Sequence, residues 1–153
     1  MRYLAIDLGD KRTGLALGDS ELRLATPIEV IQVPIGHDQG RALIGKVAAA
    51  ALLHLGDSPR SPGEIVVGLP LNMDGSEGPR AMMARRFASH VAQITNRSVH
   101  LHDERLTSAA ADWSMAMSGL THKQKKERRD ALAAAAMLQS FLDALPRPPR
   151  AEP

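Results

Sequence analysis

The segment that decides the fold is residues 3–17, YLAIDLGDKRTGLAL. Apolar side chains fill its two ends, a pattern typical of buried β-strands, and the turn-forming residues from Gly9 to Gly14 lie between them. A third apolar run follows after a short connection. The spacing predicts three antiparallel strands in a meander, at residues 2–8, 14–19 and 26–33.

Beyond residue 33 the chain alternates between helical and strand patterns. A helical period begins near Gly40, and the almost wholly apolar run 64–69 is typical of a central parallel strand. Pro79 suits the first turn of a helix. The apolar stripe of that helix is expected to consist of Met83, Phe87, Val91 and Ile94. A last strand at 98–104 and helices at 107–118 and 123–145 complete the pattern.

The element order β-β-β-α-β-α-β-α-α predicts an α/β protein. Three antiparallel strands followed by two parallel ones give a mixed five-stranded sheet, with helices on both faces. The length of 153 residues fits one domain, expected over residues 1–145. The tail 146–153 holds four prolines and is expected to be extended or disordered.

Composition excludes several kinds of chemistry. The chain has no cysteine, which rules out disulfides, thiolate metal sites and cysteine nucleophiles. No apolar run approaches the roughly 18 residues that a membrane span needs. The N-terminus also lacks the pattern of a signal peptide. We therefore expect a cytoplasmic protein without a membrane partner.

Basic charge is concentrated rather than spread. The formal net charge is +2, yet residues 122–129 contain five Lys or Arg. Such concentration favours a polyanionic partner such as nucleic acid, although a solvated helix face would look the same. Aromatic residues make up only 3% of the chain, which argues against base stacking and favours contacts to the backbone.

Three carboxylates stand where packing alone does not explain them. Asp7 and Glu104 end apolar strands, and Asp130 opens the most apolar helix. Acids are seldom buried unless they are paired or bind metal, so this pattern favours a cation site made of oxygen ligands. In isolation, Asp7 could instead cap a turn, and Asp130 could pair with Lys126 on the surface.

Two histidines leave a second kind of metal site open. His100, His102 and Glu104 alternate along the last strand and share one face. Nitrogen ligands would favour zinc or another transition metal. Such histidines more often line a half-exposed sheet surface or support a neighbouring ligand.

The residues expected to hold a nucleic-acid backbone surround the predicted carboxylate site. The loop 68–80 follows a central strand and precedes a helix N-terminus, where a phosphate could bind. The expected contacts are Lys11, Arg12, Asn72, Arg80, Arg105, Lys123, Lys125, Lys126, Arg128 and Arg129.

Four blocks of the sequence resemble the YqgF/RuvX family. They are residues 4–14, 66–81, 103–107 and 129–134, and the likeness covers nearly the whole chain except the proline-rich tail. The resemblance implies an RNase H-like fold and a nuclease site formed by Asp7, Glu104 and Asp130. Family members are bacterial and cytoplasmic, are associated with maturation of the 5′ end of 16S ribosomal RNA, and were earlier described as Holliday junction resolvases.

The expected chemistry is metal-assisted hydrolysis of a phosphodiester bond in pre-16S rRNA or branched DNA. Mg²⁺ or Mn²⁺ on the three carboxylates would activate a water and stabilise the leaving oxygen. One departure from the family pattern is Asp10, where a neutral residue is expected. Asp10 adds negative charge near the predicted site.

Three alternatives remain open at this point. A Holliday junction resolvase would use the same residues but would need a symmetric dimer, whereas a processing nuclease could be a monomer. The Asp-x-Gly opening also resembles the phosphate loops of actin-type sugar kinases and ATPases, which need two such domains. A non-catalytic RNA-binding assembly factor would explain the basic run but not the three acids.

Overall fold

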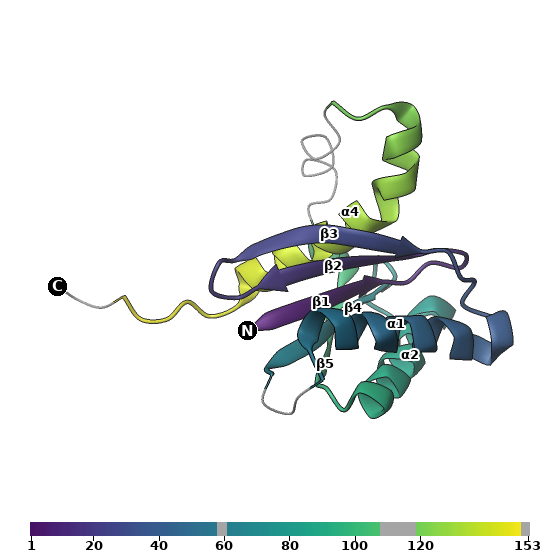
Figure 1. Ribbon diagram of the computed structural model, residues 1–153, viewed down its shortest axis with the longest axis horizontal. Helices are drawn as coiled ribbons and strands as arrows, with labels where there is room; N and C mark the ends of the chain where they lie inside the picture. Colours follow the sequence, from purple (N-terminus) through teal and green to yellow (C-terminus); the bar gives the residue numbers. More distant parts are fainter. Residues whose placement is uncertain (58–60, 108–118, 151–153) are drawn as a thin grey trace.

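The structure is a computed structural model that describes residues 1–57, 61–107 and 119–150, apart from the side chains of residues 126 and 127. Its centre is a five-stranded sheet (Figure 1). The strands are β1 (Arg2–Asp7), β2 (Thr13–Asp19), β3 (Leu24–Ile31), β4 (Gly63–Leu69) and β5 (Val99–Asp103). Their order in the sheet is β3-β2-β1-β4-β5.

The direction of the strands confirms the predicted mixed sheet. β1 runs antiparallel to β2, and β2 runs antiparallel to β3. β4 is parallel to β1, and β5 is parallel to β4. The three parallel strands β1, β4 and β5 therefore bring their carboxyl ends to one edge of the sheet, where α/β proteins usually bind ligands.

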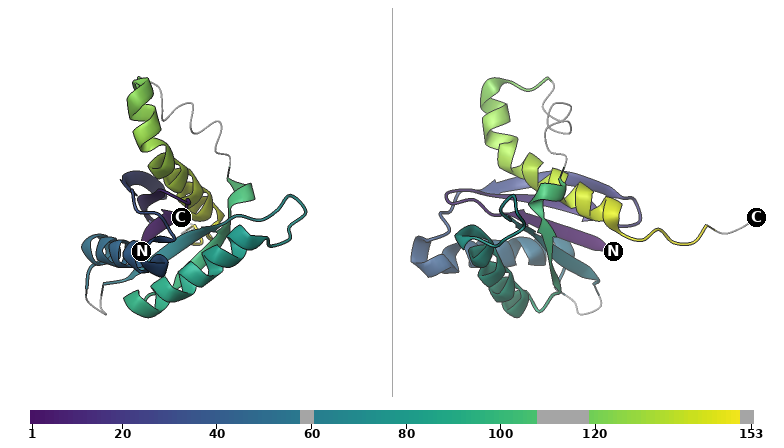
Figure 2. Two further views of the ribbon diagram at one scale, coloured as in Figure 1. Left: turned by 90° about the vertical axis from the view of Figure 1, so that its right-hand side faces the viewer. Right: turned by 180° about the vertical axis from the view of Figure 1, so that it is seen from behind.

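Helices cover both faces of this sheet (Figure 2). The helical elements are η1 (His37–Gly40), α1 (Arg41–Leu55), α2 (Pro79–Thr95), η2 (Glu104–Leu106) and α4 (His122–Ala144). α1 and α2 lie on one face and α4 lies on the other. Thr121 caps α4 through a reciprocal capping box with Gln124. Most of the helix predicted at 107–118 lies outside the described residues.

The core beneath α1 and α2 holds large aliphatic side chains from the sheet, including Leu4, Ile6 and Val67. The stripe that α2 turns toward this core includes Phe87 and Val91 of the predicted one, but it is shifted around the helix toward the alanines. Its buried residues are Ala81, Ala84, Phe87, Ala88 and Val91. Ile94 is 61% exposed, so its predicted burial is wrong. The short alanine side chains let α2 pack closely, and they displace the buried stripe away from Ile94.

The face beneath α4 is built from small residues. Ala5, Ala16 and Gly18 face the alanine-rich side of α4, and a Cβ atom on Gly18 would lie 2.8 Å from the Leu138 side chain. Small residues on both sides let the helix lie close to the strands. This close approach decides where α4 places its polar residues.

Several element boundaries differ from the predicted ones. β3 starts and ends two residues earlier than the run 26–33. Glu104, expected as the tip of the last strand, instead opens η2, and Thr107 follows as the C-cap of this short helix. Residues 146–150 have no regular structure. Among the described residues, no helix is long and apolar enough to cross a membrane.

Candidate active site

Asp7 and Glu104 meet although a whole strand separates their elements. Asp7 ends β1, Glu104 follows β5, and β4 lies between the two. Gly68 is the β4 residue at this position, and a Cβ atom there would lie 2.5 Å from Glu104 Oε1. Because Gly68 has no side chain, Glu104 can extend across β4 and form a hydrogen bond with the Asp7 carboxyl group.

Asp130 reaches the same place from the helix above the sheet. α4 passes over β2 at Gly14, which pairs with Asp7 across the antiparallel ladder. A Cβ atom on Gly14 would overlap the backbone carbonyl of Asp130. The missing side chain therefore brings the start of the buried part of α4, and with it Asp130, beside Asp7.

Burial and the neighbouring acids change the pKa of Asp7. Burial raises the pKa of Asp7 to about 8, with further contributions from the charge and hydrogen bond of Glu104 and from the charge of Asp130. Without a cation, the Asp7 carboxyl is therefore mostly protonated at neutral pH. A nearby positive charge would favour ionisation and oppose this effect.

Asp130 also has a basic partner. Its Oδ2 lies 3.5 Å from Arg12 Nε in the loop between β1 and β2, and the two side chains are 31% and 46% exposed. The alternative pairing with Lys126 involves a side chain outside the described residues. Within the parts of the chain that the structure describes, no three His, Asp or Glu side chains form a ready-made metal cage. The acids are neighbours, but they do not all converge on one point.

His102 and Ser140 connect the Glu104 turn to α4. His102 Nε2 lies 3.0 Å from Ser140 Oγ, and that hydroxyl donates to the Leu106 carbonyl at 3.1 Å. Since the serine has one proton and gives it to Leu106, His102 Nε2 must donate to the serine oxygen. Burial lowers the pKa of His102, which favours the neutral ring that this arrangement needs.

His100 lies farther from the acids. Its Nε2 is 3.0 Å from Glu64 Oε2, and its ring packs against Phe141. The contacts of His100 and His102 are therefore those of supporting residues rather than of a nitrogen-ligated metal site.

The predicted nucleic-acid contacts fall into two groups. Arg12 and Arg80 lie near the acids, and Lys11 is the exposed neighbour of Arg12 in the same loop. Arg80 Nη2 pairs with Asp10 Oδ2 at 3.1 Å. Arg105 also lies here, but it binds Asp103 and reaches the carbonyls of Asn72 and Met73. Arg105 therefore holds the loop after β4, within which the Asn72 side chain binds Ser76.

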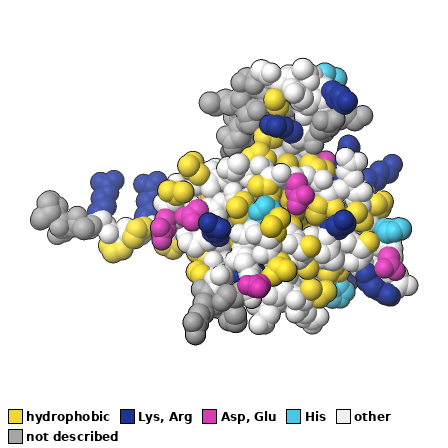
Figure 3. Space-filling model, viewed as in Figure 1, with side chains coloured by type: hydrophobic (Ala, Val, Ile, Leu, Met, Phe, Trp, Pro, Cys, Tyr) yellow, Lys and Arg dark blue, Asp and Glu magenta, His cyan; other side chains and the backbone are white. Residues whose placement is uncertain are grey.

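The second group lies on the first two turns of α4, residues 122–129, which we call the α4 arm. The arm stands away from the sheet, and dark-blue Lys and Arg side chains are visible on this part of the molecule (Figures 1 and 3). Its described basic residues with predicted contacts are Lys123, Lys125, Arg128 and Arg129. Lys126 belongs to the same turns, but its side chain is not described.

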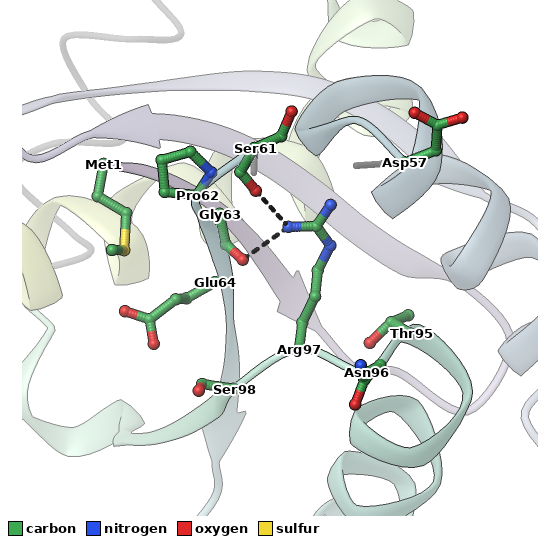
Figure 4. A pocket seen from close by; sticks show the side chains of 10 residues that line it. All are labelled: Met1, Asp57, Ser61, Pro62, Gly63, Glu64, Thr95, Asn96, Arg97 and Ser98. Carbon is green, nitrogen blue, oxygen red and sulfur yellow. Dashed lines mark hydrogen bonds between the residues drawn. The ribbon is translucent and has the colours of Figure 1, made fainter. Parts of the chain in front are cut away.

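Two cavities differ in what they offer chemically. A small one of about 40 Å³ is lined by Glu104, Gly68 and Arg80 at the carboxyl ends of the strands. A larger one of about 480 Å³ lies at the opposite end of the sheet (Figure 4). There the Arg97 guanidinium donates to the carbonyls of Ser61 and Gly63. We place the chemistry at the small cavity, because Glu104 lines it and Asp7 lies beside Glu104, whereas Arg97 at the larger cavity is engaged in holding the backbone.

Three residues important for this geometry were missed by sequence reasoning. Gly14 and Gly68 are read from sequence as ordinary strand or turn glycines, and Ser140 as one polar residue of a long helix. A glycine inside a strand does signal close approach of another group, which would have marked both glycines. No local pattern identifies Ser140.

Known proteins resemble this chain over most of its length. Residues 1–144 match the RuvX family, described as Holliday junction resolvase. A protein of Anaeromyxobacter sp. (strain Fw109-5), named "Putative pre-16S rRNA nuclease", is 43% identical over 143 residues, covering 94% of this chain and 97% of the relative. A protein of the same name from Ruegeria pomeroyi is 40% identical, over 92% of this chain and 84% of the relative.

Solved structures share the fold. Thermus thermophilus RuvC in complex with a Holliday junction has a TM-score of 0.57 at 16% identity, covering 92% of both chains. The fowlpox virus Holliday junction resolvase has a TM-score of 0.56 at 11% identity, covering 94% of this chain and 99% of that one. At these identities the likeness establishes the shared RNase H-like fold and nothing about individual residues.

Proposed function

The chain belongs to the RuvX family and is a nuclease that hydrolyses phosphodiester bonds, and we propose that Asp7, Glu104 and Asp130 form its active site. The observation that supports this assignment is that Glu104 and Asp130, from two other elements, both lie close to Asp7. Glu104 passes over Gly68, and the helix that carries Asp130 packs against Gly14. A structural role for a buried, proton-holding Asp7 would be costly for the fold. A role in the active site therefore explains the buried Asp7 carboxyl better than a structural role does.

We propose that a divalent cation binds at this site. The donor set fits Mg²⁺ or Mn²⁺, because it consists of carboxylate oxygens only and because Asp7 is largely buried with Glu104 and Asp130 close to it. Asp7 and Glu104 would hold the ion together with Asp130. When bound, the ion would activate water and stabilise the leaving oxygen.

The protein's own groups prepare this chemistry. The hydrogen bond between Asp7 and Glu104 keeps the two carboxyl groups side by side, and the contact of His102 with Ser140 fixes the turn that carries Glu104. Arg12 holds Asp130 near the site and is a candidate contact for substrate phosphate. The α4 arm would bind the nucleic-acid backbone within roughly 12 Å of Asp130 along the helix axis, given the rise of a helix.

The names of the relatives support pre-16S rRNA as the substrate, and we propose 5′-end processing of that RNA in the cytoplasm as the cellular role. The family description and the fold of the resolvases favour branched DNA as the second candidate. In either case, residues 1–145 would be the nuclease domain and 146–153 a tail outside it. A processing nuclease could act as a monomer, whereas junction resolution calls for a homodimer.

The test compares wild-type protein with Asp130→Asn on labelled 16S precursor RNA and on a labelled four-way DNA junction, in Mg²⁺, Mn²⁺ or EDTA. We expect metal-dependent cleavage by the wild type only, and the substrate cleaved faster decides between the two roles. Equal cleavage by the variant would refute the assigned site. Binding without cleavage by the wild type would favour the assembly-factor alternative.

A further inference from the structure

The loop between β1 and β2 is connected to both sides of the candidate active site by ion pairs of opposite polarity. On the α4 side the loop contributes the cation, Arg12, and the helix contributes the acid, Asp130. On the α2 side the loop contributes the acid, Asp10, and the helix contributes the cation, Arg80. The second pair has no part in the proposed chemistry, although it lies at the entrance of the site.

Arg80 is well placed to bind a phosphate of the substrate. It lines the same small cavity as Glu104 and belongs to the first turn of α2. The N-cap of that helix, Gly78, provides no side-chain hydrogen bond to the first turn. The guanidinium and the helix N-terminus therefore place positive charge beside the cavity that Glu104 lines.

The Asp10 carboxylate already forms an ion pair with the Arg80 guanidinium. Its Oδ2 lies 3.1 Å from Arg80 Nη2, and the two side chains are 69% and 65% exposed. The loop backbone holds Asp10 in place, because the Asp10 carbonyl accepts a hydrogen bond from Ile35 N at 3.0 Å. An exposed ion pair contributes little to stability, so its removal should leave the fold intact.

Building on the proposed nuclease function, we propose that Asp10 competes with a substrate phosphate for Arg80 and thereby limits the affinity of the site for nucleic acid. A phosphate oxygen offers Arg80 the same charge-assisted hydrogen bond that the Asp10 carboxylate now accepts. Binding must therefore exchange one anion for the other. The exchange therefore lowers the affinity for every nucleic acid that uses Arg80.

The experiment is a double-mutant cycle on binding in EDTA, where no cleavage occurs. The probe is a fluorescein-labelled RNA spanning the 5′ end of the 16S precursor, and anisotropy gives Kd at 50 mM salt for wild type, Asp10→Asn, Arg80→Gln and the double variant. Glu21→Gln makes the same change in net charge at the opposite end of β2 and serves as the control. Thermal melting checks that each variant is folded.

We expect Asp10→Asn to tighten binding about three- to tenfold and Arg80→Gln to weaken it. In the Arg80→Gln background, the Asp10 substitution should change Kd by less than about twofold. An equal gain in both backgrounds, an equal gain in Glu21→Gln, or a loss of affinity in Asp10→Asn would overturn the competition. Cleavage by the wild type in Mg²⁺ tests the nuclease function separately, so the two proposals can fail independently.

Discussion

Replacing Asp7 by asparagine should make the metal-free protein more stable while abolishing its activity. The folded state holds the Asp7 proton up to a pKa of about 8, whereas the ordinary value is 3.8. Below pH 3.8 the Asp7 carboxyl is protonated in both the folded and the unfolded state, so its ionisation does not lower the free energy of unfolding. As the pH rises toward 8, only the unfolded state releases the proton, so the free energy of unfolding of the wild type falls.

The size of the effect follows from that pKa difference. Each pH unit between the two values removes about 1.4 kcal/mol, which amounts to about 4 kcal/mol at pH 7. The asparagine amide is also polar and buried, so we expect Asp7→Asn to gain about 2–4 kcal/mol at pH 7 and close to nothing at pH 4. Its amide can donate a hydrogen bond to the Glu104 carboxylate.

Urea unfolding in EDTA at pH 4, 5.5, 7 and 8 measures this difference directly. Asp143→Asn, an exposed substitution near the end of α4, controls for the loss of one negative charge. Addition of Mg²⁺ should stabilise the wild type and leave Asp7→Asn unchanged, because binding to the folded state alone raises stability. The reasoning is refuted if Asp7→Asn is no more stable than the wild type at pH 7, or if the difference between them does not grow with pH.

Three further substitutions test how the acids are positioned. Gly68→Ala places a methyl group against the flexible Glu104 side chain, so we expect cleavage to fall at least tenfold with a loss of about 1–2 kcal/mol in urea unfolding. The methyl group of Gly14→Ala would collide with the Asp130 backbone carbonyl, which cannot move aside. We therefore expect the free energy of unfolding to fall by about 3 kcal/mol or more, with no activity. Ser140→Ala leaves the His102 N–H unpaired, so kcat should fall with KM nearly unchanged, at a cost of about 1–3 kcal/mol.

A matched control for these variants is Gly45→Ala, since Gly45 lies in α1 with open space around it and alanine favours helices. It should stabilise the protein and leave cleavage unaffected. Full activity in Gly68→Ala would show that Glu104 does not need its path across β4. Equal stability of Gly14→Ala and the wild type would contradict the close packing of α4 on β2.

Sequence periodicity predicted the sheet because its strands carry strong local signals. The hairpin at residues 3–17 and the apolar run at 64–69 need few long-range contacts to be recognised. The prediction of burial for Ile94 failed because the buried side of α2 is centred between Phe87, Val91 and the alanines, which leaves Ile94 at its exposed edge. Glu104 lies outside the strand because η2 begins there, with the Asp103 side chain as its N-cap.

The sequence by itself determined which residues could do the chemistry: three acids at the ends of apolar segments, basic residues around them, and no cysteine. Only the tertiary structure decided how those residues meet. Asp7 and Glu104 lie together because Gly68, the β4 residue between them, has no side chain to block Glu104. Asp130 lies beside them because α4 packs directly against Gly14 of β2. Such contacts join residues far apart in the chain, and a one-dimensional pattern cannot encode the distance between them. The tertiary structure likewise brings Asp10 and Arg80, which are 70 residues apart in the chain, together as an ion pair.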